Sequence, residues 1–178
     1  NEARLQKKCS KSPFVIKLFT LLAVNTEYAM VMEMGGRSLE SLYNSHGHHE
    51  VLERTKNNPT ERLARCKYIT WCLLKGLMHL HNNDVMHRDI GPKNILISAD
   101  GGVKLCDFGY AKVCRPGELL NDALGTPIYA SPRVLNGEPY GREADYYAAG
   151  SVLWMLDQLI EPFTGFTQLH QLLDYHDE

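Results

Sequence analysis

The sequence predicts an α+β fold, with β-strands gathered near the N-terminus and long helices in the rest of the chain. The runs at 14–24 and 27–34 are rich in β-branched and apolar residues and are separated by Asn-Thr, which indicates an antiparallel pair of strands. Two later stretches, 63–80 and 143–160, are typical of long buried helices. A group of strands followed by a group of helices is typical of the α+β class.

Composition places the chain among ordinary folded domains and excludes several classes of partner. Its 178 residues are 44% apolar and 22% charged, and the net charge is only −2. No strong field attracts nucleic acid or an anionic membrane, and no apolar run approaches the length that spans a bilayer. Five cysteines without any CxxC pair suggest neither a disulfide framework nor a zinc site. We therefore expect an intracellular protein, in cytoplasm or nucleus, with no nucleic-acid or membrane partner.

The predicted elements follow one another along the chain. Residues 1–9 form the end of a helix that Pro13 prevents from continuing, and Gly35 and Gly36 turn the chain after the strand pair. Residues 94–98 and 103–106 are two short strands joined by the turn "ADGG", followed by a loop of some twenty residues with little periodicity. Another apolar stretch, 166–175, begins a third helix. The helix at 63–80 presents one apolar face, formed by Leu63, Cys66, Ile69, Leu73, Leu77 and Leu80.

Three polar residues in the middle of the chain fit the chemistry of phosphoryl transfer. That reaction needs a carboxylate to orient and deprotonate an attacking hydroxyl, oxygen ligands for Mg²⁺, and positive charge near the phosphates. Asp89 and Asn94 stand five residues apart on a loop held by Pro92, and Asp107 follows a predicted strand. Two hard oxygen ligands from different segments suit Mg²⁺, which takes its other ligands from water and substrate phosphates.

The chain resembles the eukaryotic protein kinases in four motifs that occur in the right order. They are "HRDIGPKN" at 87–94, "DFG" at 107–109, "GTPIYASP" at 125–132 and "DYYAAG" at 145–150. The resemblance implies a two-lobed fold in which 1–34 is the end of the N-lobe and the hinge strand, and 35–178 is the hinge turn and the C-lobe. It also implies ATP and Mg²⁺ as cofactors and protein as the substrate.

The resemblance assigns chemical roles to four residues. Asp89 would be the catalytic base, Asn94 and Asp107 would hold Mg²⁺, and Thr126 would contact Asp89. A threonine at that place favours transfer to serine or threonine.

Further positions are implied to bind the nucleotide or to support the site. Met32 would be the gatekeeper, with the backbone of Glu33 and Met34 facing the adenine, Leu96 beneath it and Cys106 next to it. Cys106 would also be a candidate for alkylation, although a small packing residue is the plainer interpretation. The supporting positions are Glu2, which would pair with a lysine of the N-lobe, Arg88, the packing residues His87 and Phe108, Gly109, and Asp145, which would hold the catalytic loop.

The chain departs from the family pattern at three positions. Gly91 stands where these kinases usually carry a lysine that touches the transferred phosphate, and we expect Lys93 to supply that charge. Asp122 stands where many carry a regulatory phosphothreonine, and we expect its carboxylate to pair with Arg88 and partly replace the phosphate, unless it is simply a solvated loop residue. Arg133 replaces a glutamate that normally forms a buried pair.

The resemblance leaves two rivals to an active protein kinase. A pseudokinase scaffold with a regulatory protein partner is favoured by Gly91 and Arg133, whereas the intact Asp89, Asn94 and Asp107 favour catalysis. A small-molecule phosphotransferase would lack the "GTPIYASP" segment. The glycine-rich loop and the N-lobe lysine of the family are expected before Asn1, and its last helices after Glu178. We expect the 178-residue chain by itself to be weakly stable and inactive.

Overall fold

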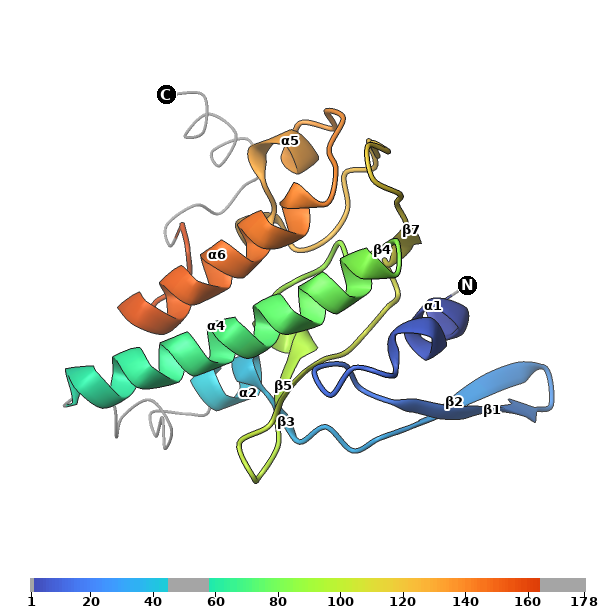
Figure 1. Ribbon diagram of the computed structural model, residues 1–178, viewed down its shortest axis with the longest axis horizontal. Coiled ribbons are helices and arrows are strands. Elements are labelled where there is room, and N and C mark those ends of the chain that lie inside the picture. The colour runs from blue at the N-terminus through green and yellow to red at the C-terminus, as the bar shows by residue number, and fades with distance from the viewer. Residues whose placement is uncertain (1, 45–57, 164–178) are drawn as a thin grey trace.

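A hairpin and a short helix form the N-terminal part of the computed structural model, which describes residues 2–44 and 58–163 (Figure 1). Helix α1 (Glu2–Cys9) precedes the antiparallel strands β1 (Leu18–Val24) and β2 (Glu27–Met32). Residues 14–16 are not part of β1, because they pair instead with Leu105, whose N–H donates to the carbonyl of Phe14 and whose carbonyl accepts from Ile16. This pairing connects the N-terminal part to the rest of the fold.

Two long helices lie side by side through the rest of the chain (Figure 1). Helix α4 (Pro59–Asn82) begins where the side chain of Asn58 accepts a hydrogen bond from the N–H of Glu61, and Pro59 occupies its first position. Helix α6 (Glu143–Gln158) packs along α4 and ends at Leu159, which has a left-handed φ of 60°. The face of α4 that packs inward is formed by Cys66, Ile69, Cys72, Leu73, Gly76, Leu77, Leu80 and His81.

Short strands close to these helices position the polar motifs. Strands β3 (Arg37–Ser38), β5 (Ile95–Ile97) and β6 (Val103–Leu105) form an antiparallel sheet with β5 in the middle. Strand β4 (Val85–Met86) pairs with β7 (Lys112–Val113), so that the chain enters and leaves the motif region on adjacent strands. The remaining elements are α2 (Leu39–Asn44), the 3₁₀ turns η1 (Pro92–Asn94) and η2 (Pro127–Tyr129), and α5 (Pro132–Leu135).

The structure confirms the α+β class, the two long helices and both predicted strand pairs. One core assignment is wrong, since Leu63 is 49% exposed because it lies ahead of the buried stretch of α4. The segment after Asp107 is more regular than predicted, because it contains β7 and a bridge between Leu120 and Tyr140. The helix predicted at 166–175 lies outside the described residues, and the lobe boundaries at 34 and 35 stay predictions.

Two expectations about bonding and membranes can be compared with the structure. All five cysteines are free thiols. Within residues 2–44 and 58–163, no helix has both the length and the apolar character needed to cross a bilayer.

Candidate active site

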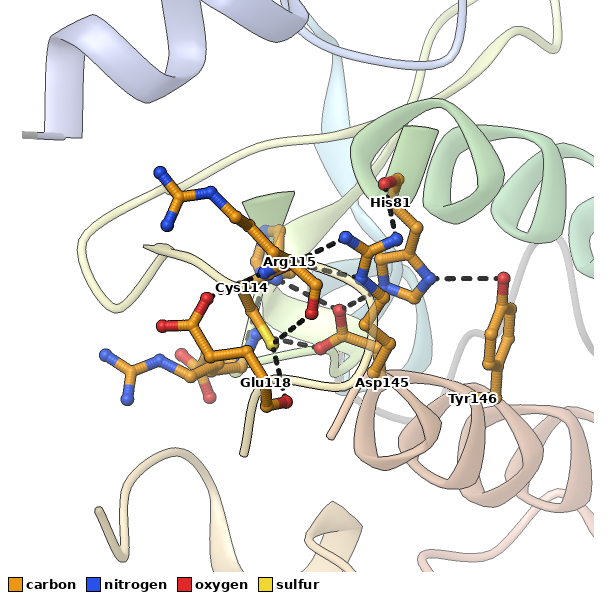
Figure 2. Close-up of polar contacts among 10 residues, drawn as sticks. His81, Cys114, Arg115, Glu118, Asp145 and Tyr146 are labelled. Carbon is orange, nitrogen blue, oxygen red and sulfur yellow. Dashed lines mark hydrogen bonds and ion pairs between the residues drawn. The ribbon is translucent and has the colours of Figure 1, made fainter. Parts of the chain in front are cut away.

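The buried carboxylate of Asp145 holds the loop that carries the polar motif. Its Oδ1 accepts a hydrogen bond from the N–H of Arg88 at 2.9 Å, and its Oδ2 accepts from the N–H of His87 at 3.0 Å. Because a carboxylate can only accept, the ring of His81, whose Nε2 lies 2.8 Å from Oδ2, must donate as well (Figure 2). Burial alone would raise the pKa of Asp145, but the hydrogen bond from His81 and the ring of His87 outweigh it and lower that pKa.

These bonds secure a stretch of backbone with unusual geometry. Arg88 has a φ of 67°, a region that residues other than glycine rarely adopt. Its carbonyl also lies close to Gly125, where an added Cβ would come within 2.6 Å of that oxygen, and Gly125 itself has a φ of 100°. Glycine at 125 therefore allows the segment that carries Thr126 to approach the loop closely.

The side chain of Asp89 is the centre of the site. It is buried, with 4% exposure. The hydroxyl of Thr126 donates to its Oδ1 at 2.9 Å, and the amide of Asn94 donates to its Oδ2 at 3.0 Å. The ammonium group of Lys93 lies 2.9 Å from the same Oδ2. The structure thus brings together all four residues to which catalytic roles were assigned from the sequence.

Lys93 extends from η1 towards both acidic groups of the site. Its hydrogen bond to Asp89 is the main cause of its raised pKa, and the charges of Asp89 and Asp107 add to it. The side chain is 42% exposed, so it is open to solvent as well as to Asp89. Gly91 has an extended backbone that any residue can adopt, with a φ of −171°. A Cβ there would touch the ring of Tyr129 at 3.4 Å, so the backbone does not require glycine.

Asn94 and Asp107 lie next to each other because their strands are paired. The carbonyl of Asn94 accepts from the N–H of Cys106 at 3.0 Å, one residue before Asp107. Since Asn94 uses its amide nitrogen on Asp89, its Oδ1 remains as a hard oxygen ligand, and Asp107 adds carboxylate oxygens. Asp107 has a φ of 60°, and its Oδ1 accepts from the N–H of Gly109. This pair of donors fits Mg²⁺ whose other ligands are water and phosphate oxygens.

Protein side chains alone supply few further metal ligands. Among the residues that the structure describes, no group of three or more His, Cys, Asp or Glu side chains could hold a metal ion. An ion at Asn94 and Asp107 would therefore depend on oxygen atoms from outside the protein.

The two residues predicted to pack rather than react, His87 and Phe108, are fully buried. Their rings lie 5.3 Å apart between centroids, and His87 Nε2 donates to the carbonyl of Cys106 at 2.9 Å. This contact fixes the start of the Asp-Phe-Gly segment against the loop of Asp89.

The predicted adenine-facing residues lie around the end of β2 and on β5. The N–H of Glu33 donates to the carbonyl of Lys17 at 2.8 Å, and its carboxylate pairs with Lys104 at 2.7 Å, which is the main cause of its lowered pKa. Met34 is 94% exposed. Leu96 is partly buried, and its side chain lies against Gly35.

Asp122 joins two segments of the site through ion pairs. Its Oδ2 lies 2.8 Å from the guanidinium of Arg88 and 3.0 Å from the ammonium of Lys112 on β7. Lys112 first and Arg88 second lower the pKa of Asp122, so that it is ionised at neutral pH. Arg88 also donates through Nε to the carbonyl of Tyr110 at 2.7 Å. The pairing of Asp122 with Arg88 expected from the sequence is present, and Lys112 was not anticipated.

Two predicted positions have no contact with this centre. Glu2 is the first residue of α1, and it has no ion-pair partner among residues 2–44 and 58–163. Arg133 is exposed on α5 and donates to the carbonyl of Pro139 at 3.4 Å.

The structure adds three residues that sequence reasoning missed. His81 lies in the last turn of α4, and Tyr146 follows Asp145 on α6. Arg142 donates to the carbonyls of His81 and Cys114 and pairs with Asp84 at 2.7 Å. The available signal for His81 was its position four residues after Leu77 on the apolar face of the helix, where an unpartnered polar group would be costly.

Comparisons with known proteins agree with the geometry. The model of the protein kinase domain matches residues 1–177. The rat protein NUAK family SNF1-like kinase 2 is 33% identical over 154 residues, which are 86% of this chain and 23% of that protein. Serine/threonine-protein kinase TIO of Arabidopsis thaliana is 40% identical over 108 residues, 60% of this chain, and serine/threonine-protein kinase 36 of Pongo abelii is 38% identical over 102 residues, 57% of it. The chain spans 8% of each of these last two proteins.

The environment of Cys106 predicts slow alkylation. Burial, with a contribution from the charge of Asp107, raises its pKa to about 11. The native thiol should stay protonated through pH 7 to 9, and its reaction rate should rise steeply only as the pH approaches 11. Site-resolved mass spectrometry after iodoacetamide treatment at pH 8 should show modification at least about tenfold slower than in urea, where the pKa returns to about 8.5. Equal rates in the native and unfolded protein would contradict this prediction.

Proposed function

The chain belongs to the protein kinase domain family, and we propose that the protein transfers the γ-phosphoryl group of ATP to serine or threonine side chains of protein substrates. The domain is homologous to serine/threonine kinases, a family that generally uses ATP with Mg²⁺ and acts on proteins. The observation that carries the proposal is the arrangement around Asp89, where a carboxylate, a cation and a hydroxyl meet within 3 Å of one another's polar atoms.

In this proposal Asp89 orients the attacking hydroxyl and accepts its proton. Thr126 and Asn94 hold the carboxylate in place through hydrogen bonds to different oxygens. A general base must lie within hydrogen-bond reach of the proton that it removes, and a fixed carboxylate meets that need without a search among rotamers.

Asn94 and Asp107 are the residues that would hold Mg²⁺, and Lys93 would stabilise negative charge beside Asp89. When bound, Mg²⁺ and ATP supply charge neutralisation and the phosphoryl group. Lys93 lies on the same loop as Asp89 and keeps its proton because its pKa is raised. Its position supports the idea that it provides the charge that Gly91 lacks.

The nucleotide base would bind at the end of β2. Met32 would be the gatekeeper, the backbone of Glu33 and Met34 would face the adenine, and Leu96 and Cys106 would lie next to it. The pair of Glu33 and Lys104 connects this segment to β6, one residue before Cys106, and so links the base site to the metal site.

The direct test is phosphoryl transfer by the full-length protein. Incubation with Mg²⁺, ATP and a degenerate serine/threonine peptide library should yield phosphopeptides, and Asp89→Asn should reduce the yield by about 10²- to 10⁴-fold, as expected for loss of general base catalysis. Absence of transfer by a folded wild-type protein would favour the pseudokinase alternative. Equal transfer by wild type and Asp89→Asn would assign the activity to another protein in the sample.

Replacement of Lys93 should lower turnover. Lys93→Ala removes the positive charge 2.9 Å from Asp89, and deletion of a single stabilising group typically lowers kcat by about 10²- to 10³-fold. Steady-state kinetics should show that loss, whereas Lys11→Ala, at an exposed lysine, should keep the wild-type kcat. An unchanged kcat in Lys93→Ala would show that the charge has another source.

We further propose that Asp122 keeps the enzyme active without phosphorylation of the activation segment. Its carboxylate joins Arg88, next to Asp89, to Lys112 on β7, and so it holds the catalytic loop and the segment together. A carboxylate carries −1, whereas a phosphate carries about −1.5 to −2, so the replacement is partial. Because the side chain of Asp122 is 41% exposed, solvent and salt screen the pair.

Asp122→Asn should lower kcat by a modest factor, about two- to tenfold, because exposed ion pairs contribute little individually. The charge-conserving Asp122→Glu should retain more activity than Asp122→Asn when both are purified from cells without other protein kinases. Raising the salt concentration should narrow the difference between wild type and Asp122→Asn. Identical activity of the three proteins would identify Asp122 as a solvated loop residue.

A further inference from the structure

The ring of His81 is held between two residues of α6. Its Nε2 lies 2.8 Å from Asp145 Oδ2, and its Nδ1 lies 3.1 Å from the hydroxyl of Tyr146 (Figure 2). The rings of His81 and Tyr146 meet edge to face, with centroids 5.0 Å apart and planes at 88°. His81 is 5% exposed, so protein atoms rather than solvent surround it.

The chemistry of the three groups fixes the direction of the hydrogen bonds at Asp145. The buried carboxylate accepts only, so His81 must carry a proton on Nε2. A tyrosine hydroxyl can donate to Nδ1 of a neutral ring and can accept from Nδ1 of a charged ring, because its hydrogen rotates. Tyr146 therefore satisfies Nδ1 in either state of the ring while Nε2 stays directed at Asp145.

We propose that Tyr146 is a positioning residue for catalysis, acting through His81 and Asp145 on the loop that carries Asp89. The same Oδ2 that accepts from His81 also accepts from the N–H of His87, and Oδ1 accepts from the N–H of Arg88. A shift of the His81 ring changes the orientation of this carboxylate. The backbone directly before Asp89 then loses part of its support.

Two further contacts place this chain of bonds at the centre of the molecule. His81 belongs to the last turn of α4, and its carbonyl accepts from Arg142 at 2.8 Å. Tyr146 and Asp145 are neighbours in the second turn of α6. The chain therefore spans the contact between the two long helices, and the relative position of the helices is transmitted to the catalytic loop.

The test is Tyr146→Phe in the full-length protein, because this change removes one oxygen and keeps the ring that packs on His81. The matched control is Tyr28→Phe, which removes the same atom from a tyrosine that is 77% exposed on β2. Amide hydrogen exchange of peptides covering 85–90 reports the support of the loop directly. Histidine-selective ¹⁵N NMR, assigned with His81→Gln, reports the state of the His81 ring.

For Tyr146→Phe we expect faster exchange of the His87 and Arg88 amides, altered ¹⁵N signals of His81, and a kcat about three- to tenfold lower with KM for ATP within about twofold, as expected for loss of one hydrogen bond. Tyr28→Phe should match wild type in every readout. Unchanged exchange at 85–90 in Tyr146→Phe would overturn the proposal, whatever the kcat. The kinetic part rests on the proposed function, whereas exchange and NMR do not, so an inactive wild type would refute that function and leave this test intact.

Discussion

The site depends on one buried carboxylate. Asp145 accepts hydrogen bonds from two consecutive backbone N–H groups, at His87 and Arg88, and from the ring of His81. These bonds stabilise the left-handed backbone of Arg88, and Asp89 follows directly. Because the pKa of Asp145 is lowered in the fold, its carboxylate contributes stability at neutral pH, and that contribution is lost as the pH falls below about 4. Helix α6 thus controls the catalytic loop through a single side chain.

Positive and negative charges alternate from the loop to the activation segment. Lys93 faces Asp89, and Arg88 and Lys112 face Asp122. Each acidic side chain is balanced by at least one cation, so the site is assembled without additional charge from a modification. The buried members of this network are the strongly fixed ones, since the exposed pair of Lys112 and Asp122 is screened by solvent. Chemistry and segment placement are therefore coupled through Arg88 and Asp89, which are neighbours in the chain.

Residue types and their spacing predicted much of this arrangement. The α+β class, both long helices and the meeting of Asp89, Lys93, Asn94 and Thr126 followed from periodicity and motif order. The roles of His81, Tyr146 and Arg142 did not, because each bridges residues about 60 apart in the chain, and such contacts leave no local pattern. Leu63 was misassigned because helical periodicity does not tell where packing along a helix begins. Lys112 was missed because a two-residue strand, β7, gives too short a signal to recognise.

The central claim is that Asn94, Asp107 and Asp89 form a site for Mg²⁺ and ATP. Calorimetric titration of the full-length protein with ATP, with and without Mg²⁺ and beside Asp107→Asn, tests it most directly. The account predicts saturable binding that needs Mg²⁺ and that is strongly weakened in Asp107→Asn, since this variant loses one of two oxygen ligands from the protein. A folded wild-type protein that binds no ATP in the presence of Mg²⁺, or equal Mg²⁺-dependent binding by the variant, would contradict it.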